Sequence, residues 1–415
     1  MNNKQVSIFF RTFAPMNKIM TYLYLVILTA TGITMAACSD DNDVTTSEGK
    51  KTFTLTVEAT NGSCDLTRAL TEESDALKAT WTTGDIVNVY DGDTKLGTLT
   101  AQSTAVKTRL SGQITAPSNP TLTLKYQETN YSNQDGTLAT IGTSHNYCLA
   151  TTTVTKIGDN YSGSAATFAS QQAIVKFTLK KKSDNSAIKA TTMDIRYTGN
   201  SSTILSLTSL TANNNGIYYI AIPPTNNNRN LTITVNDGTR YEIETPATTF
   251  EAGMFYRRNV LFTYNEIYNF SGRTGYYTVE AGHHALCKGT NESGAKLTLN
   301  EGSTATLDGL TLRSSDEDYG IQCDGNAIII LKDGTTSTIT GATGEALSVA
   351  DGKTLNITGT GTLTLIGAGS SAVYGNVSIE GTPVTNGNTN GTYDDYTNLK
   401  LVVSGGGNKW VISKK

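Results

Sequence analysis

The chain has 415 residues, of which 39 are Gly, 20 are Tyr and only 7 are Pro, and 16% are charged. Its formal net charge is −4, so electrostatics give no reason to expect nucleic acid or an anionic lipid surface as a partner. The length is sufficient for two or three domains.

Residues 16–38 have the pattern of a secretion signal that ends in a cysteine. Lys18 gives a positive start, Tyr22–Ile33 is an apolar core too short to span a bilayer, and small residues precede Cys38. The segment resembles a bacterial lipobox, which implies that Cys38 is lipidated and becomes the first residue of the mature chain. An ordinary secretory signal with a chance cysteine is the alternative, and Met16 is a second candidate start.

A signal peptide at residues 1–37 would leave residues 38–50 as a lipidated acidic tether. Residues 39–43 read Ser-Asp-Asp-Asn-Asp and resemble the surface-export signal of lipoproteins in the Bacteroidetes. This resemblance implies a body that faces outside the cell outer membrane and is attached through its lipid. Without the signal the chain carries 29 basic and 36 acidic residues, a net charge of −7. No later run approaches the apolar length of a transmembrane helix.

From residue 51 the pattern alternates with period two, which is typical of half-buried β-strands. Thr52–Ala59 is the clearest case, with apolar Phe, Leu, Val and Ala between polar residues. Further strands are predicted at Ile86–Tyr90, Thr121–Tyr126, Ala173–Lys180, Ile217–Ile222 and Leu231–Val235. A short turn at Glu72–Lys78 is the one helical candidate, so the sequence predicts an all-β fold.

Several segments between residues 51 and 265 resemble the fimbrillin family, the pilin-like surface lipoproteins of Bacteroidetes. They are Thr67–Ala69, Trp81–Tyr90, Ala166–Phe168, Ala173–Leu179 and Phe250–Tyr256. The resemblance implies two consecutive β-sandwich lobes, at residues 51–150 and 151–265. Independently of it, Trp81 before a Gly-Asp turn is predicted to be a core aromatic at the start of a strand.

Residues 266–415 have a different sequence pattern, in which short strands are separated by Gly or Asp-Gly at intervals of about twenty residues. This pattern predicts a right-handed parallel β-helix, a solenoid whose inward Leu, Ile and Val stack rung on rung. Thr354–Leu363 resembles the β-helical, carbohydrate-binding-like modules of bacterial surface proteins. Asn386–Asn390 and Lys409–Ile412 are predicted to cap the open end.

Arg68-Ala69 is the predicted processing site. In fimbrillin-like pilins an arginine-specific protease can cut at such a position, which releases the first strand and opens a groove for a strand of another subunit. Here Thr52–Ala59 would be the released piece, and the exposed strand edges would accept the new strand by β-augmentation. The resemblance therefore implies other pilin subunits as partners through strand exchange.

The four cysteines after Cys38 are too few and too scattered for a disulfide framework. They are Cys64, Cys148, Cys287 and Cys323. If a bridge forms, Cys287 with Cys323 is the favoured pair, because both fall in the repetitive region; buried free thiols are an equal alternative.

The sequence favours a non-catalytic protein without a cofactor or a metal. The acidic residues of the repetitive region mostly fall in turns, where Asp has a structural role. They are Asp308, Asp316, Asp318, Asp324, Asp333 and Asp351. His283 and His284 are neighbours whose side chains point to opposite faces of a strand, and neither they nor His145 have the surroundings of a catalytic triad.

These features predict a surface-exposed structural or adhesive subunit of a pilus, as a tip or accessory protein that presents the solenoid to a host or microbial glycan or protein receptor. One alternative is a glycan-binding surface lipoprotein that does not polymerise. Another is a β-helical enzyme that cleaves polysaccharides. Tyr319 and Tyr374 are candidates for an aromatic row, but the sequence identifies no ligand residues.

Overall fold

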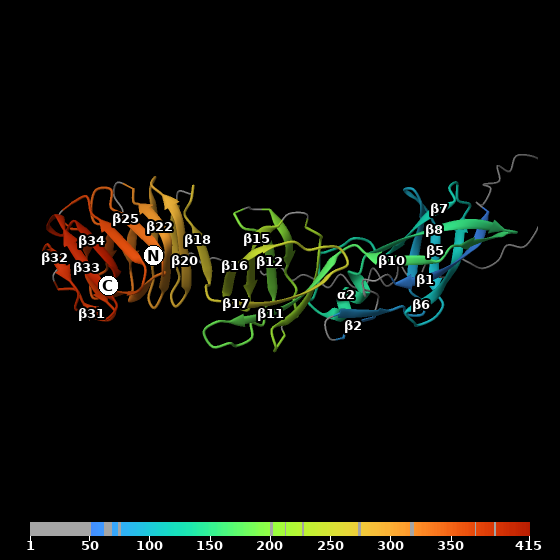
Figure 1. Ribbon diagram of the computed structural model, residues 1–415, viewed down its shortest axis with the longest axis horizontal. Helices are drawn as coiled ribbons and strands as arrows, with labels where there is room; N and C mark the ends of the chain where they lie inside the picture. The colour runs from blue at the N-terminus through green and yellow to red at the C-terminus, as the bar shows by residue number, and fades with distance from the viewer. Residues whose placement is uncertain are drawn as a thin grey trace, which may run out of the picture. The chain divides into compact units, whose positions relative to one another are not determined.

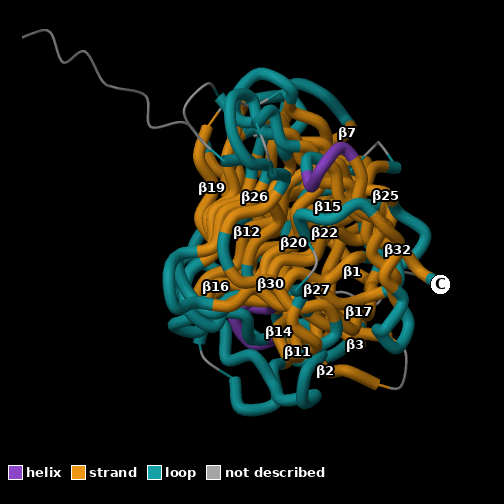
Figure 2. Tube along the Cα trace, turned by 90° about the vertical axis from the view of Figure 1, so that its left-hand side faces the viewer, coloured by secondary structure: helices purple, strands orange, loops and turns teal. Residues whose placement is uncertain are grey.

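The computed structural model describes residues 51–415 except 62–68, 74–75, 200–201, 212, 226–227, 273–274, 316–318, 370 and 386. Strands dominate this part of the chain, which confirms the predicted all-β class (Figure 2). It also contains one short helix, α2 (Leu138–Ser144), and a 3-10 turn, η1 (Gly405–Gly407). None of its helices is long and apolar enough to cross a membrane.

The first sheet has eight strands and closes on itself. Its order is β10-β1-β6-β5-β4-β7-β8-β9, and the additional pairs β10–β8 and β1–β9 join the two ends. The strands are β1 (Thr52–Asn61), β4 (Ile86–Asp91), β5 (Thr94–Ala101), β6 (Lys107–Thr115), β7 (Thr121–Tyr126), β8 (Cys148–Ile157), β9 (Asn160–Gly163) and β10 (Ala166–Ser170). This barrel therefore extends past residue 150, where the sequence predicted a division between lobes.

The apolar side chains at alternate positions of β1 are buried in the barrel core, as predicted. Phe53, Leu55, Val57 and Ala59 are all buried, whereas Glu58 is exposed. Trp81 is also in the core, as expected, and its ring makes edge contacts with Phe168 and Tyr126.

Two further sheets face each other across a second core. One has the order β14-β11-β17 and the other β13-β12-β15-β16. Their strands are β11 (Ala173–Lys181), β12 (Thr192–Tyr197), β13 (Thr203–Leu207), β14 (Ile217–Ile222), β15 (Arg229–Asn236), β16 (Arg240–Thr248) and β17 (Phe255–Phe262). We call this unit the second sheet pair. Buried Phe177 and Tyr218 from one sheet meet Ile195 and Ile233 from the other.

A hairpin of β2 (Ala69–Glu73) and β3 (Ala76–Thr80) replaces the helical turn expected at Glu72–Lys78. Its Leu77 is buried in a small cluster with Ile141 of α2 and with Ile174 and Ala221 of the second sheet pair. Leu77 is thus buried by contacts with residues that are distant in the sequence, and a local sequence pattern cannot predict such contacts.

The C-terminal part consists of a twelve-stranded and a five-stranded sheet (Figure 1). The larger sheet contains β18 (Glu266–Asn269), β20 (His284–Asn291), β22 (Thr304–Arg313), β24 (Ala327–Leu331), β25 (Thr336–Thr340), β27 (Thr354–Gly359), β28 (Thr362–Ile366), β30 (Asn376–Ile379), β31 (Thr382–Pro383), β32 (Gly391–Tyr393), β33 (Leu399–Ser404) and β34 (Lys409–Lys414). The smaller sheet contains β19 (Gly275–Val279), β21 (Ala295–Leu299), β23 (Ile321–Cys323), β26 (Leu347–Val349) and β29 (Val373–Tyr374). The strands of the smaller sheet and those from β18 to β30 in the larger sheet pair in parallel.

Register places buried apolar side chains one above another through this part of the chain. Ala285, Ala305, Ile329, Ile357 and Ile379 are successive partners in the larger sheet, and each is fully buried. The series changes direction at its end, where β34 pairs antiparallel with β28 and β33 pairs antiparallel with β34.

Candidate functional site

The candidate site consists of strand β1 and the hairpin β2–β3, which flank the predicted processing position. Cys38 and Arg68 lie outside the described residues, and Ala69 is the first residue of β2. β1 runs antiparallel to β6 through Thr52–Thr60 and is parallel to β9 and β10 on its other side. It is therefore an interior strand of the barrel, paired with β6 along one edge and, along the other, with β9 at Thr54–Thr56 and with β10 at Ala59–Asn61.

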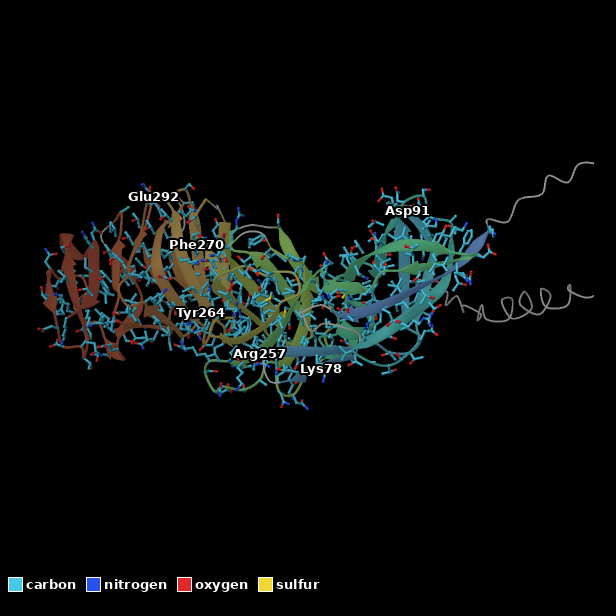
Figure 3. All side chains as sticks on the ribbon, turned by 45° about the vertical axis from the view of Figure 1, so that its right-hand side comes forward. Lys78, Asp91, Arg257, Tyr264, Phe270 and Glu292 are labelled. Carbon is cyan, nitrogen blue, oxygen red and sulfur yellow. The ribbon has the colours of Figure 1, made fainter. Side chains whose placement is uncertain are left out.

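Glu72 on β2 fixes the hairpin to the second sheet pair. Its carboxylate accepts hydrogen bonds from Lys176 Nζ at 2.7 Å, from Arg257 Nη2 at 2.6 Å and from the Tyr219 hydroxyl. Register explains this convergence, because Lys176 on β11 lies opposite both Tyr219 on β14 and Arg257 on β17. Arg257 is labelled in Figure 3.

The surroundings of Glu72 keep its carboxylate ionised. Burial raises its pKa, but the hydrogen bonds from Lys176, Tyr219 and Arg257 outweigh that effect and lower the pKa to about 2. The same carboxylate raises the pKa of Lys176 through its hydrogen bond. Sequence reasoning missed this cluster, because its members are 104 to 185 residues away from Glu72 along the chain.

The acidic residues proposed from the sequence do not form a group. Asp308 pairs with Lys332, Gln322 donates to Asp324 and Thr360 donates to Asp333. Asp316 and Asp318 lie outside the described residues. Within the described ranges no three His, Cys, Asp or Glu side chains are arranged to hold a metal ion.

The histidines serve separate local contacts. His283 Nδ1 is 2.9 Å from Glu266 Oε1, His284 Nε2 is 2.8 Å from Thr306 Oγ1, and His145 Nδ1 is 2.8 Å from the Asn130 carbonyl. Burial lowers the pKa of His284.

Cys287 and Cys323 are buried free thiols, which is one of the two outcomes that the sequence left open. The two residues lie on β20 and β23, which belong to different sheets. Burial raises the pKa of both thiols, that of Cys323 to about 11. Cys148 is likewise buried and free, and Cys64 lies outside the described residues.

The two tyrosines suggested for an aromatic row differ in exposure. Tyr374 on β29 is 51% exposed, whereas Tyr319 is half-buried. The sequence did not single out Tyr276 on β19, which is 68% exposed.

No protein-family model and no curated protein matched this sequence. Among solved structures, a fimbrial protein from Bacteroides ovatus is similar over 51% of this chain and 49% of its own, with 13% identity and a TM-score of 0.29. The match thus spans about half of that protein.

Two structures described as a "putative cell adhesion protein" are similar over more of their own length. The one from Bacteroides uniformis matches 50% of this chain and 93% of its own, with 14% identity and a TM-score of 0.31. The one from Bacteroides eggerthii matches 51% and 87%, with 11% identity and a TM-score of 0.29. Likeness at these TM-scores carries no argument about function.

Proposed function

We propose that this chain is a cell-surface adhesive subunit of the fimbrillin type, exported as a precursor that is anchored to the outer membrane through lipidated Cys38 until it is cut after Arg68. We further propose that its C-terminal parallel strands form a right-handed β-helix that presents a binding surface, and that the protein is not an enzyme. The arrangement of the strands supports this proposal, and the similarity to solved structures is not used for it.

The observation that carries the proposal is the position of β1 relative to the hairpin that follows it. β1 is an interior strand of the barrel, whereas β2 is held on the second sheet pair by Glu72. A cut at Arg68-Ala69 would therefore separate two segments that are fixed to different sheets. β1 could leave while the new N-terminus at Ala69 stays attached.

Loss of β1 would leave a groove that favours refilling by a strand of the same pattern. Phe53, Leu55 and Val57 are 6%, 0% and 0% exposed, and burial of each such side chain contributes about 1.5–3 kcal/mol. The facing edges of β6 and β10 would also lose their main-chain partners. A strand donated by another subunit would satisfy both requirements, which is the physical basis of β-augmentation.

N-terminal sequencing and intact-mass analysis of protein taken from its native cell surface test the proposal. We expect a mature chain that begins at Ala69 and assembles with other pilin subunits, and we expect Arg68→Lys to retain lipidated Cys38. Arg109→Lys, at an exposed position on β6, is the matched control and should leave processing unchanged.

A wild-type chain that retains lipidated Cys38 and never enters a polymer would refute strand exchange. That result would favour the alternative of a non-polymerising, glycan-binding surface lipoprotein.

A further inference from the structure

A broad cavity of about 750 Å³ lies where the second sheet pair is followed by the C-terminal sheets. Its walls come from the ends of β11 and β17, from β16 and from the turn before β20. The volume is in the range of pockets that hold small ligands. None of the motifs discussed above assigns a function to this cavity.

Main-chain and amide contacts tie the walls of the cavity together. Asn265 Nδ2 donates to the Arg240 carbonyl at 2.9 Å, and Asn265 Oδ1 accepts from the His284 amide at 2.8 Å. Tyr264, labelled in Figure 3, forms an isolated antiparallel bridge with Glu242. The Lys182 amide donates to the Phe262 carbonyl at 2.8 Å. The segment that joins the two parts is therefore held from both sides.

Four basic residues line the cavity. Lys181, Lys182, His283 and His284 contribute to the walls, and none of the described lining residues carries a carboxylate. Behind the walls, Asp237 lies 3.9 Å from Lys181 and Glu266 bonds to His283. Lys182 is exposed, and its ammonium has no ion-pair partner within the described part of the chain.

The cavity also offers an aromatic wall and neutral hydrogen-bonding groups. Half-buried Tyr241 supplies the aromatic surface, and Phe262, which is 2% exposed, packs edge-on against it from the core with the ring centroids 6.3 Å apart. Lys181 Nζ lies 5.1 Å from the centre of the Tyr241 ring. Ser183 and Thr239 add hydroxyl groups. Aromatic surface suits the CH groups of a sugar ring, hydroxyl groups suit its hydroxyls, and an unpaired lysine suits an anionic substituent.

We propose that this cavity binds an acidic saccharide, a short oligosaccharide in which a sugar ring carries a carboxylate. Lys182 supplies the ion pair, Lys181 remains shared with Asp237, and Tyr241, supported from behind by Phe262, contacts the ring. The inference deepens the adhesive role proposed above and rests on that role for its biological setting, but it does not depend on strand exchange.

Calorimetric titration of the full protein with carboxylated oligosaccharides tests the inference. The probes are trigalacturonate, a hyaluronan tetrasaccharide and 3′-sialyllactose, each compared with its methyl ester, which removes the charge and keeps the ring. We expect at least one acid to bind and its ester to bind about tenfold more weakly or not at all. Lys182→Ala should weaken binding of that acid by a similar factor.

Lys95→Ala on β5 is the matched control, since Lys95 is an exposed lysine away from the cavity. Binding of the acids that is unchanged in Lys182→Ala, or equal binding of acid and ester, would overturn the proposal. So would the absence of binding by all three acids at about 10 mM, or binding of a tetraglutamate peptide in their place. If the same preparation is cleaved normally after Arg68, a failure to bind these acids concerns the cavity and not the proposed strand exchange.

Discussion

The attachment of the hairpin β2–β3 through Glu72 leads to a quantitative prediction. We consider Glu72→Gln, which keeps the size of the side chain but removes the charge that Lys176 and Arg257 contact. The Glu72 pKa of about 2, compared with 4.5 for a free glutamate, corresponds to about 3 kcal/mol at neutral pH. Because 20% of the side chain is exposed, screening by water reduces the expected contribution to about 2 kcal/mol.

The sign of the pH dependence follows from the lowered pKa. The contribution of Glu72 is fully present above pH 4.5, where the carboxylate of the unfolded chain is ionised, and it is lost as the pH falls from 4.5 towards 2. Urea denaturation of wild type and Glu72→Gln should differ by about 2 kcal/mol at pH 7 and by less than half of that at pH 3. Hydrogen exchange of residues 69–80 should be faster in the variant at pH 7.

The matched control is Glu251→Gln, at an exposed position before β17. It should change the free energy of unfolding by less than about 0.5 kcal/mol. The reasoning would be refuted if Glu72→Gln had as small an effect as Glu251→Gln, or if its effect were the same at pH 7 and pH 3.

Three further variants or probes test the C-terminal sheets. Gly359→Ala, where φ is +104° and a Cβ would lie 2.2 Å from the Leu331 carbonyl oxygen, should cost more than about 2 kcal/mol in urea denaturation. Gly334→Ala, at φ +71° in open space, should cost about 1 kcal/mol, and equal costs would contradict the close approach. Leu355→Ala, at a fully buried position, should cost about 2–5 kcal/mol against less than about 0.5 for exposed Thr354→Ala, and comparable values would argue against an inward Leu355. Cys287 and Cys323 should resist iodoacetamide until the protein is denatured, as mass mapping would show; rapid labelling of the native protein would mean that the thiols are accessible.

Local pattern was sufficient to predict several strands but not the contacts between distant segments. The alternation in Thr52–Ala59 predicted β1 and its buried face, because one side of that strand faces the core along its whole length. Helix α2 was not predicted, since its seven residues include Gly142 and two threonines, which are weak helix formers. It forms because Thr137 caps its first turn and because Ile141 packs against Leu77.

The same distinction applies to the candidate site. Arg68-Ala69 was noticed because a short motif lies next to a strand, whereas Glu72, four residues further on, was placed in a possible turn. Its importance depends on three strands, β11, β14 and β17, whose register aligns Lys176, Tyr219 and Arg257. No local period encodes such an alignment, because it depends on which strands pair and in which register.

Glu72 and β1 together give processing at Arg68 a defined physical consequence. If β2 were simply a continuation of β1 in the same sheet, a cut between them would leave both strands held by common neighbours. In this chain β1 is bonded to β6, β9 and β10, whereas β2 pairs with β3 and is anchored to β11 and β17 through Glu72. Release of β1 would therefore leave the anchor of the hairpin intact, and the cost of release would be confined to the main-chain bonds and apolar contacts that an incoming strand restores.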